Sequence, residues 1–391
     1  MKKTHWALAI GGSLCAFGLL LGAAALALNG FDFMRTVTTV KYEQKTAAYE
    51  PALLEGIDVA AEDMKIVVSP SPDGQVHLTY WESAADIVTV GVNNGRLEFR
   101  HNTEESWIDN FIRGFWNGLS RLRHYIEVKI PSDYTGSLLV SNDNASLSAS
   151  GLSALSGASF YAKNASLELT DITSLGALTA ETTNGSLSLD RVSAGSARIT
   201  NTNARIRLID THLGDTVLQT DNGSVLLSSV SVGTLTAKTK NASFDAESLT
   251  GTGRVELETT NGSLSAIDVK TAGDLSLKSK NGSVRATNCS SAALTAGTSN
   301  GKIDLSRCKA DRIQAETSNS ALEFDRLESL DITLSSSNGG IRGSVLGREE
   351  DYVIVTRTTN GSSNITDRVG DLPGRLNIST TNASIRVTFE S

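Results

Sequence analysis

The feature that most constrains the fold of this chain is an asparagine that returns every 19 to 22 residues. Gly or Ala usually follows it, and Ser usually follows that residue. An interval this short leaves no room for a strand, a helix and their loops, so each interval predicts one coil of a repeat solenoid. The thirteen asparagines are Asn144, Asn164, Asn184, Asn203, Asn222, Asn241, Asn261, Asn281, Asn300, Asn319, Asn338, Asn360 and Asn382.

Two apolar columns appear when the repeats are aligned on this asparagine, three and five residues after it. Leu187 with Leu189 and Phe244 with Ala246 are examples, and the residue between them is polar in most repeats. A period of two indicates a strand with one buried face. A second strand with the same period precedes the asparagine. The sequence therefore predicts an all-β, single-stranded β-solenoid of about 12–13 coils, roughly 58 Å long at a strand spacing of about 4.8 Å.

The asparagines themselves are predicted to form a structural turn ladder. Thr or Ser stands two residues before most of them, on the inward parity of the preceding strand. Asparagine tolerates left-handed backbone geometry, and a neighbouring Gly or Ala lets the chain turn closely. Stacked asparagine side chains hydrogen-bond to one another along a repeat axis. We therefore expect a row of asparagine amides along one edge of the rod.

The N-terminal segment predicts attachment to a membrane. Residues 6–28 carry no charge and would form a helix roughly 34 Å long, enough to cross a bilayer. A cleaved signal peptide is the alternative, although its apolar region is usually shorter. Lys2 and Lys3 place residues 1–5 in the cytoplasm. The prediction is a single-pass protein of the cell membrane, with a juxtamembrane linker at 29–52 and an extracytoplasmic C-terminal domain.

Residues 53–135 are predicted to form an N-terminal β cap, because an open solenoid end is an exposed sheet edge. Alternating segments include residues 64–68, 76–81 and 125–131, and Asn94-Gly95 and Asp73-Gly74 predict hairpin turns. An amphipathic pattern over residues 107–122 predicts a short helix that either covers the coil end or lies on the membrane. The solenoid repeats occupy the remaining residues, 136–391.

Composition excludes several classes of partner and site. The net charge of −8 gives no basic surface for nucleic acid. Three Cys and five His without a cluster predict no metal site, no disulfide framework and no cofactor. Cys289 and Cys308 fall in the same apolar column of adjacent repeats. They are predicted to be neighbouring core thiols, either free or joined as a disulfide.

No repeat gathers the residues that catalysis requires. Asp245, Asp304 and Glu323 share an outward column, but Arg285 and Arg342 are interspersed with them. A solvated face of mixed charge explains this pattern better than a pair of catalytic carboxylates. The chain is therefore predicted not to be an enzyme, and a polysaccharide-degrading solenoid is the least favoured function.

The order of anchor, cap and repeats resembles the bacterial DUF4097 family. The resemblance covers most of residues 31–391. It rests on Asn29-Gly30-Phe31-Asp32-Phe33, the segment from Ile57 to Pro70, the strand from Ile126 to Pro131, and turns such as Thr182-Thr183-Asn184-Gly185-Ser186. It implies a membrane-attached, extracytoplasmic β-solenoid that carries the label of adhesin by inference. It brings no catalytic residues with it.

Two functions follow from these features as expectations. The first is a non-catalytic, adhesin-like surface-binding or scaffold protein, with cell-wall polysaccharide or a surface protein as its partner in addition to the membrane. The second is an accessory or sensor subunit of an envelope-stress regulatory system. Fold alone does not choose between them.

Overall fold

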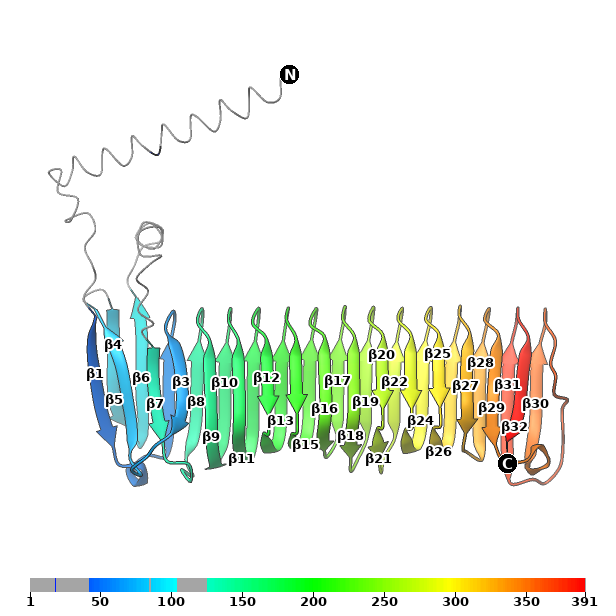
Figure 1. Cartoon of the computed structure of the whole chain (residues 1–391), viewed down its shortest axis with the longest axis horizontal. Coiled ribbons are helices and arrows are strands. Elements are labelled where there is room, and N and C mark those ends of the chain that lie inside the picture. The colour runs from blue at the N-terminus through cyan, green and yellow to red at the C-terminus, as the bar shows by residue number, and fades with distance from the viewer. Residues whose placement is uncertain (1–17, 19–41, 84–85, 104–124, 391) are drawn as a thin grey trace, which may run out of the picture.

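The computed structural model describes residues 18, 42–83, 86–103 and 125–390, and they form an elongated β-solenoid of about 12 turns (Figure 1). The predicted all-β solenoid is therefore confirmed. Apart from Gly18, the predicted membrane helix at 6–28 lies outside the described residues, as does the predicted helix at 107–122. Within the described part of the chain, no helix has the length and apolar character that a membrane crossing requires.

The elements fall into a proximal cap and a stack of coils. The cap contains β1 (Glu43–Tyr49), the 3-10 helix η1 (Pro51–Leu53), β2 (Gly56–Ala61), β3 (Lys65–Pro70), β4 (Val76–Glu82), β5 (Asp86–Asn93), β6 (Arg96–Thr103) and β7 (Tyr125–Ile130). The coils contain β8 (Ser137–Asn142), β9 (Leu147–Leu155), β10 (Gly157–Ala162), β11 (Leu167–Thr182), β12 (Leu187–Asp190), β13 (Ser193–Asn201), β14 (Ile206–Ile209), β15 (His212–Thr220), β16 (Val225–Val232), β17 (Leu235–Thr239), β18 (Phe244–Gly251), β19 (Val255–Thr259), β20 (Leu264–Ile267), β21 (Lys270–Thr271), β22 (Leu275–Ser279), β23 (Val284–Thr287), β24 (Ser290–Thr298), β25 (Ile303–Ser306), β26 (Lys309–Thr317), β27 (Leu322–Leu327), β28 (Asp331–Ser336), β29 (Ile341–Leu346), the 3-10 helix η2 (Glu349–Asp351), β30 (Tyr352–Thr358), β31 (Gly374–Thr380) and β32 (Ile385–Glu390).

Adjacent coils pair in parallel and place equivalent residues side by side. Val225 lies opposite Ile206 on one side and Phe244 on the other, so one column of the sequence alignment becomes one row of the core. The residues three and five positions after each asparagine in the regular coils are buried. The predicted core columns are therefore confirmed. Cys289 and Cys308 belong to this core, and both are free and buried.

The left-handed corner of each regular coil lies seven residues after the asparagine rather than at it. None of the thirteen asparagines has a positive φ. The corner residue has a positive φ, and it is Gly151 in the first regular coil and a polar residue in the others. The polar corner residues are Asp171, Arg191, Asp210, Ser229, Ser248, Asp268, Asn288, Arg307 and Arg326, with φ between 49° and 55°. The predicted left-handed role of the asparagines is therefore wrong: their side chains join neighbouring coils by hydrogen bonds instead, as Asn261 does with Asn241.

Ser248 offers a test of this corner, because its φ is 55° and its side chain is exposed. We expect Ser248→Val to lower the free energy of unfolding by about 1–2 kcal/mol, since a β-branched side chain clashes in the left-handed region. Ser248→Gly should keep or slightly raise it, by no more than about 1 kcal/mol. Chemical denaturation measures both variants, and equal effects would contradict the assigned corner.

The proximal end departs from sequence order. β2 pairs in parallel with β8 on one side and β6 on the other, and β3 pairs likewise with β9 and β7. β5 and β6 form the hairpin that was predicted at Asn94-Gly95. The hairpin predicted at Asp73-Gly74 is wrong: β3 and β4 do not pair, because β7 takes the edge of β3 and then pairs antiparallel with β4.

The distal end also reverses the order of its last two coils. β31 inserts between β28 and β30, so the chain passes over one position, forms its outermost strand, and then returns to fill the gap. A bridge between Ile354 and Arg368 covers part of the outer edge of β30. β31 is therefore internal although it follows β30 in the sequence, and β30 lies at the end of the rod (Figure 1).

Candidate functional site

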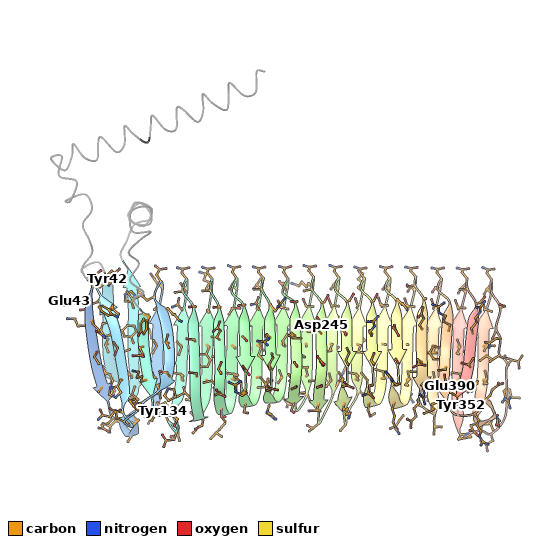
Figure 2. All side chains as sticks on the ribbon, in the orientation of Figure 1. Tyr42, Glu43, Tyr134, Asp245, Tyr352 and Glu390 are labelled. Atoms are coloured by element: carbon orange, nitrogen blue, oxygen red, sulfur yellow. The ribbon has the colours of Figure 1, made fainter. Side chains whose placement is uncertain are left out.

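The thirteen asparagines form one continuous ladder along an edge of the rod, and Figure 2 shows the regular row of side chains there. Each Nδ2 donates to the Oδ1 of the asparagine in the neighbouring coil at 2.6 to 2.8 Å. All donors point toward the proximal end, where Asn144 donates to the Asp63 carboxylate at 2.8 Å. The ladder therefore has a direction, and an acceptor carboxylate closes its donor end.

A second ladder of hydroxyls lies inside the same turn. The Thr259 hydroxyl accepts the Gly262 amide at 3.1 Å and donates to the Ala242 carbonyl of the preceding coil at 3.0 Å. Ser279 repeats this arrangement with Gly282 and Gly262. These bonds satisfy buried backbone groups that the turn would otherwise leave unpaired. The inward Thr and Ser column is therefore explained by hydrogen bonding as well as by size.

Thr259 and Thr239 give a matched test of the hydroxyl ladder. Both occupy the same inward column, but the Thr239 hydroxyl is buried without a hydrogen-bond partner. We expect Thr259→Val to lower the free energy of unfolding by about 1–3 kcal/mol, because the buried Gly262 amide and Ala242 carbonyl would lose their hydrogen-bond partner. Thr239→Val should be neutral or stabilising. Urea denaturation measures the free energy of unfolding of both variants. An equal decrease in both would contradict the stabilising role of the hydroxyl hydrogen bonds.

The outward charged column consists of paired surface charges from Arg285 to Arg342, whereas Asp245 lies between Leu226 and Ser265 and forms no salt bridge with a described residue. Glu323 is within 2.6 Å of Lys302 and also pairs with Arg342, and Asp304 lies 3.8 Å from Arg285. Hydrogen bonds from Lys302 and Arg342 lower the pKa of Glu323, and Lys302 has the larger effect. A carboxylate held ionised by cations is a poor general acid. In the described part of the chain, no three metal-ligating side chains come together.

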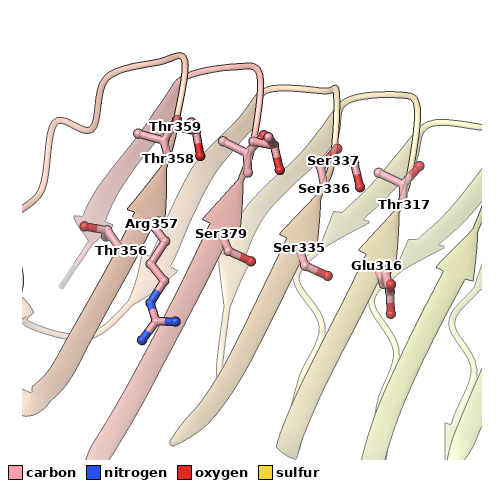
Figure 3. Close-up of a pocket in the computed structure, with 12 residues that line it drawn as sticks. Glu316, Thr317, Ser335, Ser336, Ser337, Thr356, Arg357, Thr358, Thr359 and Ser379 are labelled. Atoms are coloured by element: carbon pink, nitrogen blue, oxygen red, sulfur yellow. The ribbon is translucent and has the colours of Figure 1, made fainter.

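A trough at the distal end is the strongest candidate for a binding site. It has a volume of about 530 Å³ and lies on the outer face of β26, β28, β31 and β30, beside the turns (Figure 3). Ten of its twelve lining residues carry hydroxyls, and the other two are Glu316 and Arg357. The lining residues are Glu316, Thr317, Ser335, Ser336, Ser337, Thr356, Arg357, Thr358, Thr359, Ser379, Thr380 and Thr381.

Strand register sets the geometry of this trough. Glu316 lies opposite Ser335, Ser335 opposite Ser379, and Ser379 opposite Arg357, so the four form one row across four strands (Figure 3). Three strand spacings separate the two charges, which is about 14 Å between their Cα atoms. The two serines are short, so the surface between Glu316 and Arg357 is hollow. The reversed order of the last coils is what places Arg357 beyond Ser379.

Asp367 anchors the outer wall of the trough. Its Oδ1 accepts the Thr356 amide at 2.7 Å and the Thr356 hydroxyl at 3.0 Å. These two bonds lower the pKa of the Asp367 carboxyl, and the bond from the Thr356 amide has the larger effect. The positive charge of Arg357 lowers this pKa further. An aspartate thus blocks one exposed amide of the edge strand β30.

The hydrogen bonds between Asp367 and Thr356 should depend on pH. Because its pKa is lowered in the folded chain, its contribution to stability is complete above the ordinary value of 3.8 and is lost as the pH falls through the lowered value. We expect an NMR titration of the Asp367 carboxyl to have its midpoint below 3.8, and the Thr356 amide resonance to shift with it. A midpoint at or above that value, or a Thr356 amide resonance that does not shift with pH, would contradict the hydrogen bonds between Thr356 and Asp367.

Comparison with known proteins identifies the family. The model of the family described as Toastrack DUF4097 matches residues 54–270, which is more than half of the chain. The chain belongs to the Toastrack DUF4097 family. The resemblance to DUF4097 is therefore confirmed over the cap and the first seven rungs of the ladder, Asn144 to Asn261. The trough lies beyond the Toastrack match, so its residues are features of this chain rather than of the family model.

Solved structures add little to the Toastrack assignment. A "putative cell adhesion protein" from Clostridium sporogenes ATCC 15579 is 9% identical, with 90% of this chain and 100% of that chain covered and a TM-score of 0.22. A "putative adhesin" from Bacteroides fragilis NCTC 9343 is 12% identical, with 88% and 97% covered and a TM-score of 0.17. Both scores are too low to support an inference. No curated protein matches the chain.

Proposed function

We propose that this Toastrack protein is a non-catalytic, adhesin-like scaffold that stands on the outer side of the cell membrane and binds a polymer of the cell envelope. A single helix at residues 6–28 would hold it in the membrane, with the C-terminal domain outside. The partners would be the membrane and a cell-wall polysaccharide or surface protein.

The observation that carries this proposal is the distal trough. It is polar, open and lined by side chains that donate and accept hydrogen bonds, which suits a hydroxylated ligand. It lies at the end of the rod opposite Tyr42 and Glu43, the residues that lead back toward the proposed anchor (Figure 2). A rigid rod of parallel strands would hold such a site away from the bilayer surface.

Sedimentation with cell wall tests the proposal. The full-length chain in detergent micelles is mixed with cell wall from the organism that produces it, at physiological ionic strength, with cellulose as the control surface. We expect retention on cell wall but not on cellulose, and soluble wall fragments should compete. No retention would contradict surface binding and favour the regulatory alternative, in which the ectodomain contacts a membrane protein; crosslinking to membrane neighbours would then identify it.

A further inference from the structure

We infer that the distal trough recognises a zwitterionic glycan segment, one that carries an acidic group and a free amine on neighbouring sugars. This inference rests on the proposed envelope-binding function and names the ligand class of its site. Arg357 would bind the acidic group, Glu316 the ammonium, and the hydroxyls between them the sugar hydroxyls.

The two charges at the ends of the trough are available to a ligand. Glu316 and Arg357 are both exposed, and neither forms a salt bridge with another described residue. By contrast, Arg312 on β26 and Asp331 on β28 pair with each other at 2.8 Å. An arginine fork matches a carboxylate or phosphate, and a glutamate accepts an ammonium group. The trough therefore offers opposite charges about 14 Å apart at their Cα atoms.

Nine of the ten hydroxyls of the trough divide into a fixed inner layer and a free outer layer, and the tenth, that of Thr356, donates to Asp367. Thr317, Ser336, Thr358 and Thr380 each donate to a backbone carbonyl at 2.8 to 3.1 Å, so their positions are set. Within the described chain, no hydrogen bond engages the side chains of the free layer, which consists of Ser335, Ser337, Thr359, Ser379 and Thr381. Free hydroxyls both donate and accept, as recognition of sugar hydroxyls requires.

The absence of an aromatic side chain among the lining residues narrows the ligand further. Without a ring to stack on a sugar face, recognition must come from charge and hydrogen bonds. Because these contacts are exposed to solvent, binding should weaken as salt is added. A neutral glycan would leave both charges of the trough without a partner. The trough therefore favours a ligand with charges of both signs.

Calorimetry on the full-length chain in detergent micelles tests this inference with three probes. They are a glucuronic acid–glucosamine disaccharide with a free amine, its N-acetylated form, and the neutral disaccharide of N-acetylglucosamine. We expect the free-amine probe to bind about 10-fold more tightly than the N-acetylated one, and the neutral probe to bind most weakly. Equal affinities for all three probes would overturn the charge assignment.

Three variants assign the contacts. Arg357→Gln should weaken both acidic probes about 10-fold, whereas Glu316→Gln should abolish only the preference for the free amine. Arg375→Gln is the matched control, because Arg375 lies on β31 outside the trough, is exposed, and loses the same charge. Its affinities should not change. Unaltered thermal unfolding must accompany each variant, so that a loss of binding reports the site.

The outcomes separate this inference from the proposed function. If the chain is retained on cell wall but Arg357→Gln and Glu316→Gln bind as the unchanged chain does, the trough assignment is wrong and envelope binding stands. If the chain binds neither the wall nor the probes, both are wrong. If Arg375→Gln weakens binding as much as Arg357→Gln does, binding follows net charge and the trough assignment is also overturned.

Discussion

Replacing Asn261 by proline is expected to break the rod near its middle. The Asn261 amide donates to the Lys240 carbonyl at 2.9 Å, and its side chain joins Asn241 and Asn281 in the ladder. Proline lacks the amide and the ladder side chain, so we expect the free energy of unfolding to fall by more than about 3 kcal/mol. Because each coil contacts only its neighbours, thermal unfolding should also separate into two transitions.

Two companion variants isolate the cause of that loss. Asn261→Ala keeps the backbone amide and removes only the ladder bonds, so its effect should be clearly smaller. Ser265→Lys alters an outward position between Asp245 and Arg285, and should change stability by less than about 0.5 kcal/mol. An equal loss for Asn261→Pro and Ser265→Lys would contradict the outward assignment of Ser265.

Truncating Phe244 should have an effect of similar size through packing. Phe244 is fully buried and lies in register with Val225 and Leu264 in the adjacent coils. We expect Phe244→Ala to lower the free energy of unfolding by about 3–5 kcal/mol, because the stacked coils cannot collapse into the cavity. Chemical denaturation measures the change.

Asp245 supplies the control for this cavity. It is the next residue along β18, its side chain is exposed, and Asp245→Ala should change stability by about 0.5 kcal/mol or less. A loss below about 1 kcal/mol for Phe244→Ala would show that the core column is not tightly packed.

The sequence predicted the middle of the rod better than its ends. In the middle, each residue meets its equivalent 19 or 20 positions away, so periodicity alone identifies the core columns and the asparagine ladder. The ends depend on non-local pairing that leaves no period, as where β7 separates β3 from β4 and β31 separates β28 from β30. Hydrophobic alternation describes which face a strand buries but not which strand lies beside it.

The same limit explains why neither the corner nor the trough was predicted from the sequence. The left-handed corner is filled by Asp, Arg, Ser and Asn rather than by a column of glycines, so the usual signal was missing. The trough needs the reversed order of the last coils, since sequence order would place Arg357 next to Ser335 instead of beyond Ser379. What the repeats did contain was the hydroxyl column, whose inner members form the fixed layer of the trough.

Cysteine labelling on intact cells with a membrane-impermeant maleimide tests whether the rod stands outside the membrane with its trough at the wall. In a Cys15→Ser background, Ser337→Cys places a thiol at the trough and Ser265→Cys places one in mid-rod. The same background without either variant is the blank, because Cys289 and Cys308 are buried. We expect both variants to react on intact cells, and digestion of the cell wall to speed labelling at residue 337 more than at residue 265. Labelling only after the cells are broken, or wall digestion that affects the two positions equally, would contradict the proposed placement.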